Sequence, residues 1–317
     1  PYRDVLRGYG EPPMLYFRYI SRILLSLKLM LKHDFKADYV VSTTNHLYDI
    51  IPAILYRLIR GAKLIFYVHS IINIRLQYGL VDFLRSLIAY ITQFLGLSIG
   101  KVCSDKIFVI NPLIRKFVGE KSYITWNGVE EVKVSKPPRK IWDFCYIGRL
   151  DKTKDIEVLL KAWRISEKRD LKMRLILIGR GELYNSIREM IERGEVKNIY
   201  LTGPLYGFRK YDVISKSRFL INLSRSESFS TVILEALAMG IPVIARRLPI
   251  LEALYGDMLI YIDDISPEEL AEYLTEIIRD HREMARKILS NSKLLSRKYS
   301  WKNIALYELK VILNEKK

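Results

Sequence analysis

The sequence predicts two α/β domains, each built on a doubly wound parallel sheet. Three observations support this fold class. The chain has 317 residues, enough for two domains of about 150 residues each. Half of the residues (50%) are hydrophobic and 27% are charged, as in ordinary globular proteins. Short β-branched runs alternate with amphipathic helical patterns, which is typical of parallel sheets.

The predicted strands fall into two groups, one in each half of the chain. The strands of the first half are Tyr39–Ser42, Leu64–Val68, Lys106–Ile110 and Ser122–Thr125. The strands of the second half are Phe144–Ile147, Arg174–Ile178, Ile199–Leu201, Phe219–Leu223, Pro242–Ala245 and Leu259–Ile262. Strands that alternate with helices in this way predict one sheet in each half.

A proline-containing segment separates the two groups of strands. Val134–Lys140 holds two prolines and three basic residues, which oppose a helix and favour an extended connector. We therefore expect an amino-terminal Rossmann-like domain over residues 1–136 and a carboxy-terminal one over residues 141–299. Apolar residues at helical spacing over Trp301–Lys310 predict a further helix, within residues 300–317, that packs back on the first domain.

The composition limits the classes of partner. A net charge of +17 predicts attraction to nucleic acid, anionic membrane or phosphorylated small molecules. Cys103 and Cys145 fall in different predicted domains without metal-ligand spacing, which argues against a disulfide framework or a zinc site. No stretch resembles a signal peptide, and polar residues interrupt the apolar region Leu80–Ile99. We therefore expect a cytoplasmic protein without a membrane span, a metal or a cofactor.

One segment of the second half combines a strand, a polar turn and a helix. In Leu223–Ala245 an apolar strand enters a turn rich in serine and glutamate, a helix follows from about Ser230, and Gly240 with Pro242 ends it. Ligands of open parallel sheets bind outside the carboxyl ends of the strands, and the free N–H groups of a helix start suit a diphosphate. The residues predicted to line this site are Glu227, Ser228, Phe229, Ser230 and Thr231.

Two glutamates of this segment differ in their surroundings. Glu227 stands in the turn, whereas Glu235 lies about a turn and a half inside the helix. A carboxylate can accept two hydrogen bonds from vicinal hydroxyls, which a ribose or a hexose offers. We assign Glu235 to a ribose and Glu227 to the sugar. The alternative is that Glu235 faces solvent, although its small or apolar neighbours leave only a narrow exposed face.

A second strand-to-helix turn supplies positive charge. The segment Cys145–Leu160 passes through Gly148, which permits close backbone approach, and places Arg149 and Lys154 at the mouth of the loop. Two fixed cations there can neutralise a diphosphate and stabilise it as a leaving group without a metal. The alternative is that both are solvated surface charges, as is common in so basic a chain.

Two weaker features complete the candidate site. Gly179 and Gly181 follow a predicted strand and open a helix, so a tight strand-to-helix turn explains at least one of them and phosphate binding is the alternative. His69 ends the apolar strand in Phe66–Ser70, where a neutral imidazole can hydrogen-bond to a sugar hydroxyl. A purely structural histidine is the alternative.

Taken in order, these motifs resemble glycosyltransferase family 4, the retaining GT-B group marked by two glutamates with seven residues between them. The matching motifs are His69-Ser70, Asn127-Gly128, Gly148-Arg149-Leu150 with Lys154, Gly179-x-Gly181, Gly203, and Glu227 to Glu235 followed by Gly240-x-Pro242. The resemblance covers nearly the whole chain from about Ala37 and is most specific over Tyr146–Ala245.

The resemblance implies two Rossmann-like domains facing a cleft and a hexosyltransferase that acts with retention. Such an enzyme moves a sugar from a nucleoside-diphosphate sugar, such as a UDP- or GDP-sugar, to a glycan or lipid-linked acceptor, without metal or cofactor. In the family, the matching arginine and lysine hold the phosphates, the first glutamate contacts the sugar, the second binds ribose, and the histidine lies by the reacting sugar. These roles carry over to Arg149, Lys154, Glu227, Glu235 and His69.

The sequence departs from the family pattern at two places. It lacks the glycine-rich loop that follows the first strand in the family, and that strand as well, so we expect an incomplete amino-terminal domain. Asp155 stands where the family usually has glycine after the lysine, which is expected to affect the backbone of the loop but not the cation.

The basic, apolar character of the first half leaves other partners open. Met14–Lys32 alternates basic with apolar residues and, with Leu80–Ile99, is compatible with peripheral contact with anionic lipid; both segments alternatively cover the first sheet. Other function classes are a non-catalytic GT-B subunit that binds a nucleotide sugar, and a GT-B epimerase or phosphorylase. A nucleic-acid-binding protein is disfavoured because aromatic stacking motifs and recognition helices are missing from the sequence.

Overall fold

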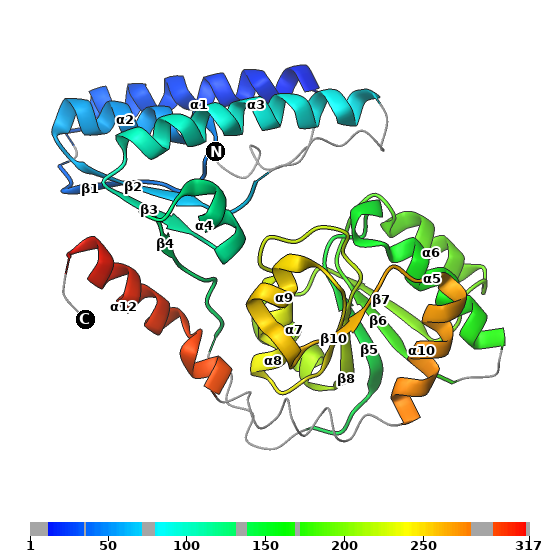
Figure 1. The fold of residues 1–317 in the computed structure, drawn as a ribbon. Coiled ribbons are helices and arrows are strands. Elements are labelled where there is room, and N and C mark those ends of the chain that lie inside the picture. Colours follow the sequence, from blue (N-terminus) through cyan, green and yellow to red (C-terminus); the bar gives the residue numbers. More distant parts are fainter. Residues whose placement is uncertain are drawn as a thin grey trace. The chain divides into compact units, whose positions relative to one another are not determined.

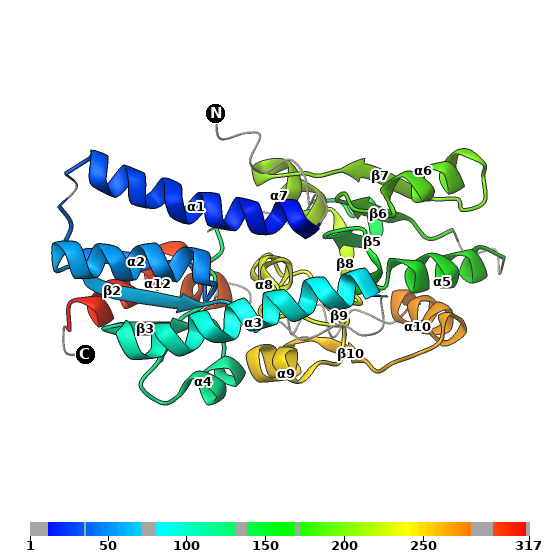
Figure 2. The ribbon, with the colours of Figure 1, turned by 90° about the horizontal axis from the view of Figure 1, so that it is seen from above.

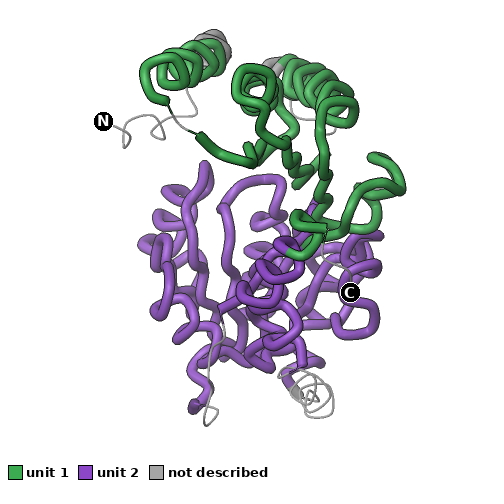
Figure 3. Tube along the Cα trace, turned by 90° about the vertical axis from the view of Figure 1, so that its left-hand side faces the viewer, with its two compact units in different colours: residues 1–125, 310–317 green, residues 126–309 purple. Residues whose placement is uncertain are grey.

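The computed structural model divides into two compact units, which we describe separately (Figure 3). Unit 1 comprises residues 1–125 and 310–317, and unit 2 comprises residues 126–309. The structure describes residues 12–34, 36–71, 80–130, 138–168, 172–279 and 294–314. Most of the connector predicted over Val134–Lys140 lies outside the described residues.

Unit 1 contains a four-stranded parallel sheet. The strands pair in the order β1 (Tyr39–Ser42), β2 (Lys63–Val68), β3 (Lys106–Val109) and β4 (Tyr123–Ile124). All four predicted strands are confirmed, with small differences at their ends. The apolar side chains of β2 are almost all buried, as expected for a strand with a neighbour on each side.

Three long helices of unit 1 lie together over one face of this sheet (Figures 1 and 2). They are α1 (Pro12–Lys32), α2 (Leu47–Arg60) and α3 (Leu80–Cys103). The short helix α4 (Pro112–Val118) follows β3 and is capped by Asn111, whose Oδ1 accepts a hydrogen bond from the Ile114 amide at 2.8 Å. The start of α4 is thus determined by a capping residue in the local sequence.

The inner face of α3 is fitted closely to unit 1. A Cβ atom added at Gly100 would clash with an aromatic ring of β2, and one added at Gly96 would clash with the carbonyl of Asn45. The buried Gln93 side chain also donates to Asn45 Oδ1 at 3.3 Å. By length and composition alone, Ser86–Cys103 is a helix that could cross a membrane. The contacts of Gly96, Gly100 and Gln93 show that one face of this helix packs on unit 1.

Unit 2 contains a six-stranded parallel sheet whose strand order is β10-β9-β8-β5-β6-β7. All six strands predicted for the second half are confirmed. Their bounds are β5 Trp142–Ile147, β6 Leu175–Ile178, β7 Ile199–Gly203, β8 Ser217–Asn222, β9 Val243–Arg246 and β10 Ile260–Ile262. The first three strands run outward from β5 in one direction and the last three run outward from β8 in the other. The winding therefore reverses between β5 and β8.

Helices cover both faces of this sheet, as Figure 1 shows. On one side lie α5 (Ile156–Lys168), α6 (Tyr184–Glu192) and α10 (Pro267–Arg279). On the other side lie α7 (Gly207–Ser215), α8 (Thr231–Ala238) and α9 (Pro249–Tyr255). Short 3-10 turns occur at Lys152–Lys154 and Gly256–Met258. Phe144, Trp163 and Phe219 are fully buried in the core between the sheet and α5. Unit 2 is thus a doubly wound α/β unit.

The predicted carboxy-terminal helix is confirmed as α12 (Trp301–Ile312). Just before it, Ser300 forms a parallel bridge with Val129, and Trp301 contacts Gly128, where an added Cβ would meet the indole at 2.5 Å. The segment after β4 therefore lies against the start of α12 within unit 2. The predicted domain bounds, and the docking of residues 300–317 on the first domain, stay predictions.

Candidate functional site

The reversal of winding in unit 2 brings two turns together at the carboxyl ends of neighbouring strands. One turn (residues 148–155) follows β5 and the other (residues 223–230) follows β8, and the Arg225 amide links them by donating to the Thr153 carbonyl at 3.1 Å. Ligands of doubly wound sheets bind at this switch point. The two predicted motifs with the strongest functional signals therefore belong to one site.

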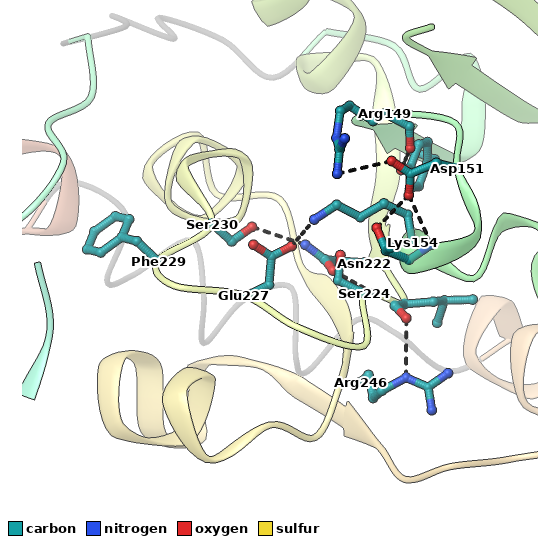
Figure 4. Close-up of polar contacts among 12 residues, drawn as sticks. Arg149, Asp151, Lys154, Asn222, Ser224, Glu227, Phe229, Ser230 and Arg246 are labelled. Carbon is teal, nitrogen blue, oxygen red and sulfur yellow. Dashed lines mark hydrogen bonds and ion pairs between the residues drawn. The ribbon is translucent and has the colours of Figure 1, made fainter. Parts of the chain in front are cut away.

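A lysine–glutamate ion pair joins these turns. Lys154 Nζ donates to Glu227 Oε1 at 2.6 Å (Figure 4). The side chains are 20% and 12% exposed, so the pair is largely removed from water. The structure thus brings together one predicted phosphate-binding cation and the predicted sugar-binding carboxylate. The interpretation of Lys154 as a freely solvated surface charge is wrong.

Arg149 lies on the same turn in a more open position. Its guanidinium pairs with Asp151 at 3.1 Å and its side chain is 62% exposed (Figure 4). The turn beneath it is fixed, because Tyr146 donates its hydroxyl to the Arg149 carbonyl at 2.6 Å. Burial raises the pKa of Tyr146, so its hydroxyl keeps the proton that this bond needs. Arg149 is therefore a solvated cation carried by a rigid backbone.

The glycines near this site have a packing role. A Cβ atom on Gly179 would clash with the Gly148 carbonyl, and one on Gly181 would clash with the Leu150 carbonyl. Gly179 also has φ +149°, a conformation that L side chains rarely adopt. The turns after β5 and β6 consequently approach at backbone contact. A tight turn thus explains both glycines, and their part in binding a donor stays a prediction.

The start of α8 is held by side-chain contacts from three directions. Ser230 adopts a left-handed conformation with φ 58°, and Asn222 Nδ2 donates to its Oγ at 3.0 Å. Tyr255 donates to the Phe229 carbonyl at 3.0 Å, and Asn127 Nδ2 donates to Thr231 Oγ1 at 3.3 Å. The Phe229 side chain is buried, so within this turn it serves as an anchor. The first N–H groups of α8 are thereby presented from a fixed backbone.

Glu235 is buried on α8 and only one of its oxygens is used. Its Oε1 accepts from Lys210 Nζ at 2.6 Å and lies 3.4 Å from the Tyr211 hydroxyl. Its Oε2 is buried and has no hydrogen-bond partner among the described residues. Glu235 is 6% exposed, so the interpretation of a solvent-facing glutamate is wrong. Burial, followed by the nearby Glu235 charge, raises the pKa of Tyr211 to about 12.

Several residues of this site could not be recognised from the sequence. Lys210 and Tyr211 stand in α7 without a distinguishing pattern, and they meet Glu235 only because α7 and α8 pack on the same side of the sheet. Arg225 and Arg246 both pair with Asp155, which lies directly after Lys154. Asp155 has φ 51°, a left-handed conformation that glycine adopts readily.

His69 follows β2 in unit 1, as predicted, and is exposed. Its ring stacks on that of Tyr67 with a centroid distance of 5.8 Å. Because it belongs to unit 1, it is not among the residues that unit 2 brings together. Its role toward a sugar stays a prediction.

Comparisons with known proteins agree with this geometry. The family model described as glycosyl transferases group 1 matches residues 130–294, more than half of the chain. An uncharacterized glycosyltransferase of Methanocaldococcus jannaschii is 27% identical over 217 residues, which cover 66% of this chain and 59% of the relative. An alpha-monoglucosyldiacylglycerol synthase of Streptococcus pneumoniae is 30% identical over 112 residues, 35% of this chain and 25% of the relative. The chain thus spans less than two thirds of the length of these relatives.

Solved structures share the fold at low sequence identity. The pneumococcal O-GlcNAc transferase, in complex with UDP and GlcNAc, superposes with a TM-score of 0.71 at 16% identity, covering 93% of this chain and 60% of that one. The sucrose-phosphate synthase from Thermosynechococcus elongatus gives 0.71 at 17% identity, covering 97% and 80%. These similarities establish a GT-B fold with two Rossmann-like domains. The matched family model shows that the chain belongs to the glycosyl transferases group 1 family.

Proposed function

We propose that this chain is a retaining, metal-independent hexosyltransferase of the family 4 type that uses a nucleoside-diphosphate sugar. The observation that carries the proposal is the buried Oε2 of Glu235, which accepts no hydrogen bond from any residue that the structure describes. Leaving a buried acceptor without a hydrogen bond costs about 1–3 kcal/mol. A ribose hydroxyl that donates to this oxygen would recover that free energy on binding.

The remaining groups of the site match the other parts of such a donor. Lys154, Arg149 and the N–H groups at the start of α8 supply positive charge for a diphosphate. Glu227 supplies acceptors for sugar hydroxyls once Lys154 turns to the phosphates. We assign His69, from unit 1, a hydrogen bond to a hydroxyl of the reacting sugar.

The proposed chemistry is a substitution at the anomeric carbon. Its bond to the diphosphate oxygen breaks, the electron pair stays on the diphosphate, and the acceptor oxygen bonds to the same face of the carbon. The acceptor proton passes to the departing diphosphate. The positive groups are most effective as charge develops on that leaving group, so they lower the barrier rather than only the dissociation constant.

The test is ligand-dependent thermal stability with UDP-, GDP- and ADP-sugars. The true donor should stabilise the parent by about 2.7 kcal/mol at 100 times its Kd. Glu235→Ala should lose this stabilisation, whereas Glu276→Ala, at an exposed glutamate of α10, should retain it. If no sugar nucleotide stabilises the parent, or Glu235→Ala binds equally well, the proposal is wrong. Binding without transfer or donor hydrolysis would instead indicate a non-catalytic subunit.

We further propose that unit 1 contacts the cytoplasmic face of an anionic membrane and that the acceptor is lipid-linked. Ile20, Leu24, Lys28 and Leu31 recur at helical spacing on α1, and the three apolar side chains are 57–81% exposed. On α3, Leu84, Ile91, Leu95 and Val102 likewise share an exposed face. Apolar side chains interleaved with lysine suit the boundary between lipid headgroups and acyl chains. One relative is named for a glycolipid product, alpha-monoglucosyldiacylglycerol.

Co-sedimentation with vesicles tests this contact. The parent should pellet with vesicles that contain anionic lipid more than with purely zwitterionic vesicles. Leu24→Asp with Leu31→Asp should reduce pelleting strongly. As the control, Leu309→Asp changes a leucine of α12 that is 49% exposed. Equal pelleting of the double variant and the parent would exclude α1 as the contact.

A further inference from the structure

Asp155 combines a rare backbone conformation with a buried charge. It lies between Lys154 and the first residue of α5, has φ 51° and ψ 35°, and is 7% exposed. A left-handed conformation is uncommon for residues with a Cβ atom, although aspartate and asparagine adopt it more often than most. Residues held in such conformations need surrounding structure to fix them, and they are frequent at functional sites.

Two arginines, one from a turn and one from the end of a strand, hold this carboxylate. Arg225 Nε donates to Asp155 Oδ1 at 2.8 Å, and Arg246 Nη2 pairs with Oδ2. Arg246 stands at the end of β9 and is itself buried, with its Nε donating to the Leu223 carbonyl at 3.2 Å (Figure 4). Its Nη1 also pairs with Asp264, whose side chain is 76% exposed. The Asp155 carboxylate therefore ties together the turns that follow β5 and β8 and the end of β9.

Stability alone does not account for this cluster. Charges taken out of water lose hydration, so a buried ion pair often contributes no net stability compared with apolar residues of the same size. The cluster does, however, fix the positions of two particular turns. Asp155 follows Lys154 directly, and Arg225 is separated from Glu227 by a single residue, so one carboxylate fixes both turns that carry the 2.6 Å Lys154–Glu227 pair.

We infer that Asp155 is a positioning residue of the donor site. It holds the Lys154 turn against the Glu227 turn through Arg225 and Arg246, without touching the donor itself. The inference rests on the proposed function, because it assumes that Lys154 and Glu227 receive a nucleoside-diphosphate sugar. Loss of the Asp155 carboxylate should leave Lys154 present but displaced. Displacement of a binding group by about 1 Å is enough to weaken binding and turnover.

Nucleotide affinity tests the inference in the full chain. UDP, GDP and ADP are titrated calorimetrically into the parent, Asp155→Asn and Asp264→Asn. Asparagine tolerates the left-handed conformation, and each variant removes one negative charge from the same cluster. Added positive charge alone would tighten binding in both variants. Positioning by Asp155 predicts about tenfold weaker binding in Asp155→Asn, or about 1.4 kcal/mol, and no weakening in Asp264→Asn.

Two further measurements separate positioning from general destabilisation. Asp155→Gly removes the backbone strain and should still bind about tenfold more weakly, while hydrogen exchange rises in residues 149–155 and 224–230 together. If Asp155 acts through Arg225, then Asp155→Asn with Arg225→Gln should bind no more weakly than Asp155→Asn alone. Parent-like affinity in Asp155→Asn or Asp155→Gly overturns the inference and leaves the proposed function intact. If the parent binds none of the three nucleotides, both fail.

Discussion

Among the described residues of unit 2, two lysine–glutamate pairs have the same 2.6 Å separation but different surroundings. Lys154 and Glu227 lie on turns at the switch point, whereas Lys210 and Glu235 lie on the packed helices α7 and α8. In the second pair, Glu235 keeps a buried oxygen without a partner among the described residues. In the proposed function, the Lys154–Glu227 pair separates so that each side chain can bind the donor. The Lys210–Glu235 pair stays intact and offers Glu235 Oε2 as an acceptor.

This difference affects how much each pair would contribute to the free energy of binding the proposed donor. A diphosphate that takes Lys154 must first separate it from Glu227, so part of the new ion-pair energy is offset by the pair that is lost. A ribose that binds Glu235 would meet an oxygen to which none of the described residues bonds, because Lys210 and Tyr211 contact only Oε1. The helix pair should therefore act in binding alone, whereas the turn pair should act both in binding and during transfer.

The largest effect is expected for Lys154→Met. Removing the cation leaves Glu227 as an uncompensated acid beside the proposed diphosphate. We expect nucleoside diphosphate affinity to fall about 10–100-fold, as for a lost hydrogen bond to a charged group. Sugar transfer should fall further, by about 10²–10³-fold in kcat, as when an oxyanion donor is removed. Calorimetry and donor turnover measure the two effects.

Lys152 provides the matched control for this prediction. It belongs to the same 3-10 turn but is exposed. Its backbone amide donates to Glu182 Oε1 at 3.4 Å and its carbonyl accepts from the Asp155 amide at 3.3 Å, so both of these contacts leave its ammonium group aside. Lys152→Met should therefore change affinity and kcat by less than about threefold, within the range of exposed charges. Equal losses in the two variants would mean that net charge, rather than the Lys154–Glu227 geometry, governs binding.

An intermediate effect is expected for Lys210→Met. Without the lysine, the buried Glu235 carboxylate loses the ammonium group that pairs with it at 2.6 Å, and breaking a buried ion pair leaves a charge that is poorly compensated. Nucleoside diphosphate affinity should therefore fall about tenfold. Calorimetry measures this loss.

The control for Lys210 is Lys216, which lies at the carboxyl end of the same helix and pairs with Asp212 at 2.7 Å in a more exposed position. Lys216→Met should leave the affinity unchanged. Parent-like affinity in Lys210→Met would show that binding does not depend on the cation beside Glu235. The fixed-acceptor interpretation of this pair would then be wrong.

The strands and the two glutamates were predictable because local pattern determines them. Most of the described strands are short apolar runs rich in β-branched or aromatic residues, and the apolar neighbours of Glu235, Leu234 and Ala236, already disfavoured a solvent-facing position. The partners of these glutamates were not predictable. Lys210 meets Glu235 across 25 residues of sequence, and the left-handed Asp155 depends on arginines 70 and 91 residues away. Such contacts follow from how the turns pack, which periodicity does not encode.

The smallest effect on nucleotide affinity is expected for Glu227→Gln, and its sign is opposite. Glutamine keeps the size of the side chain but frees Lys154 from its ion pair, so a nucleoside diphosphate no longer competes with a carboxylate for the cation. We expect affinity for the sugar-free nucleotide to stay equal or to tighten by up to about threefold, within the range measured for a partly exposed pair. Turnover of the sugar nucleotide should fall, because a neutral amide replaces the proposed acceptor for sugar hydroxyls. Weaker nucleotide binding in Glu227→Gln would mean that Glu227 contacts the nucleotide itself. The assignment of the nucleotide to Glu235 and of the sugar to Glu227 would then be wrong.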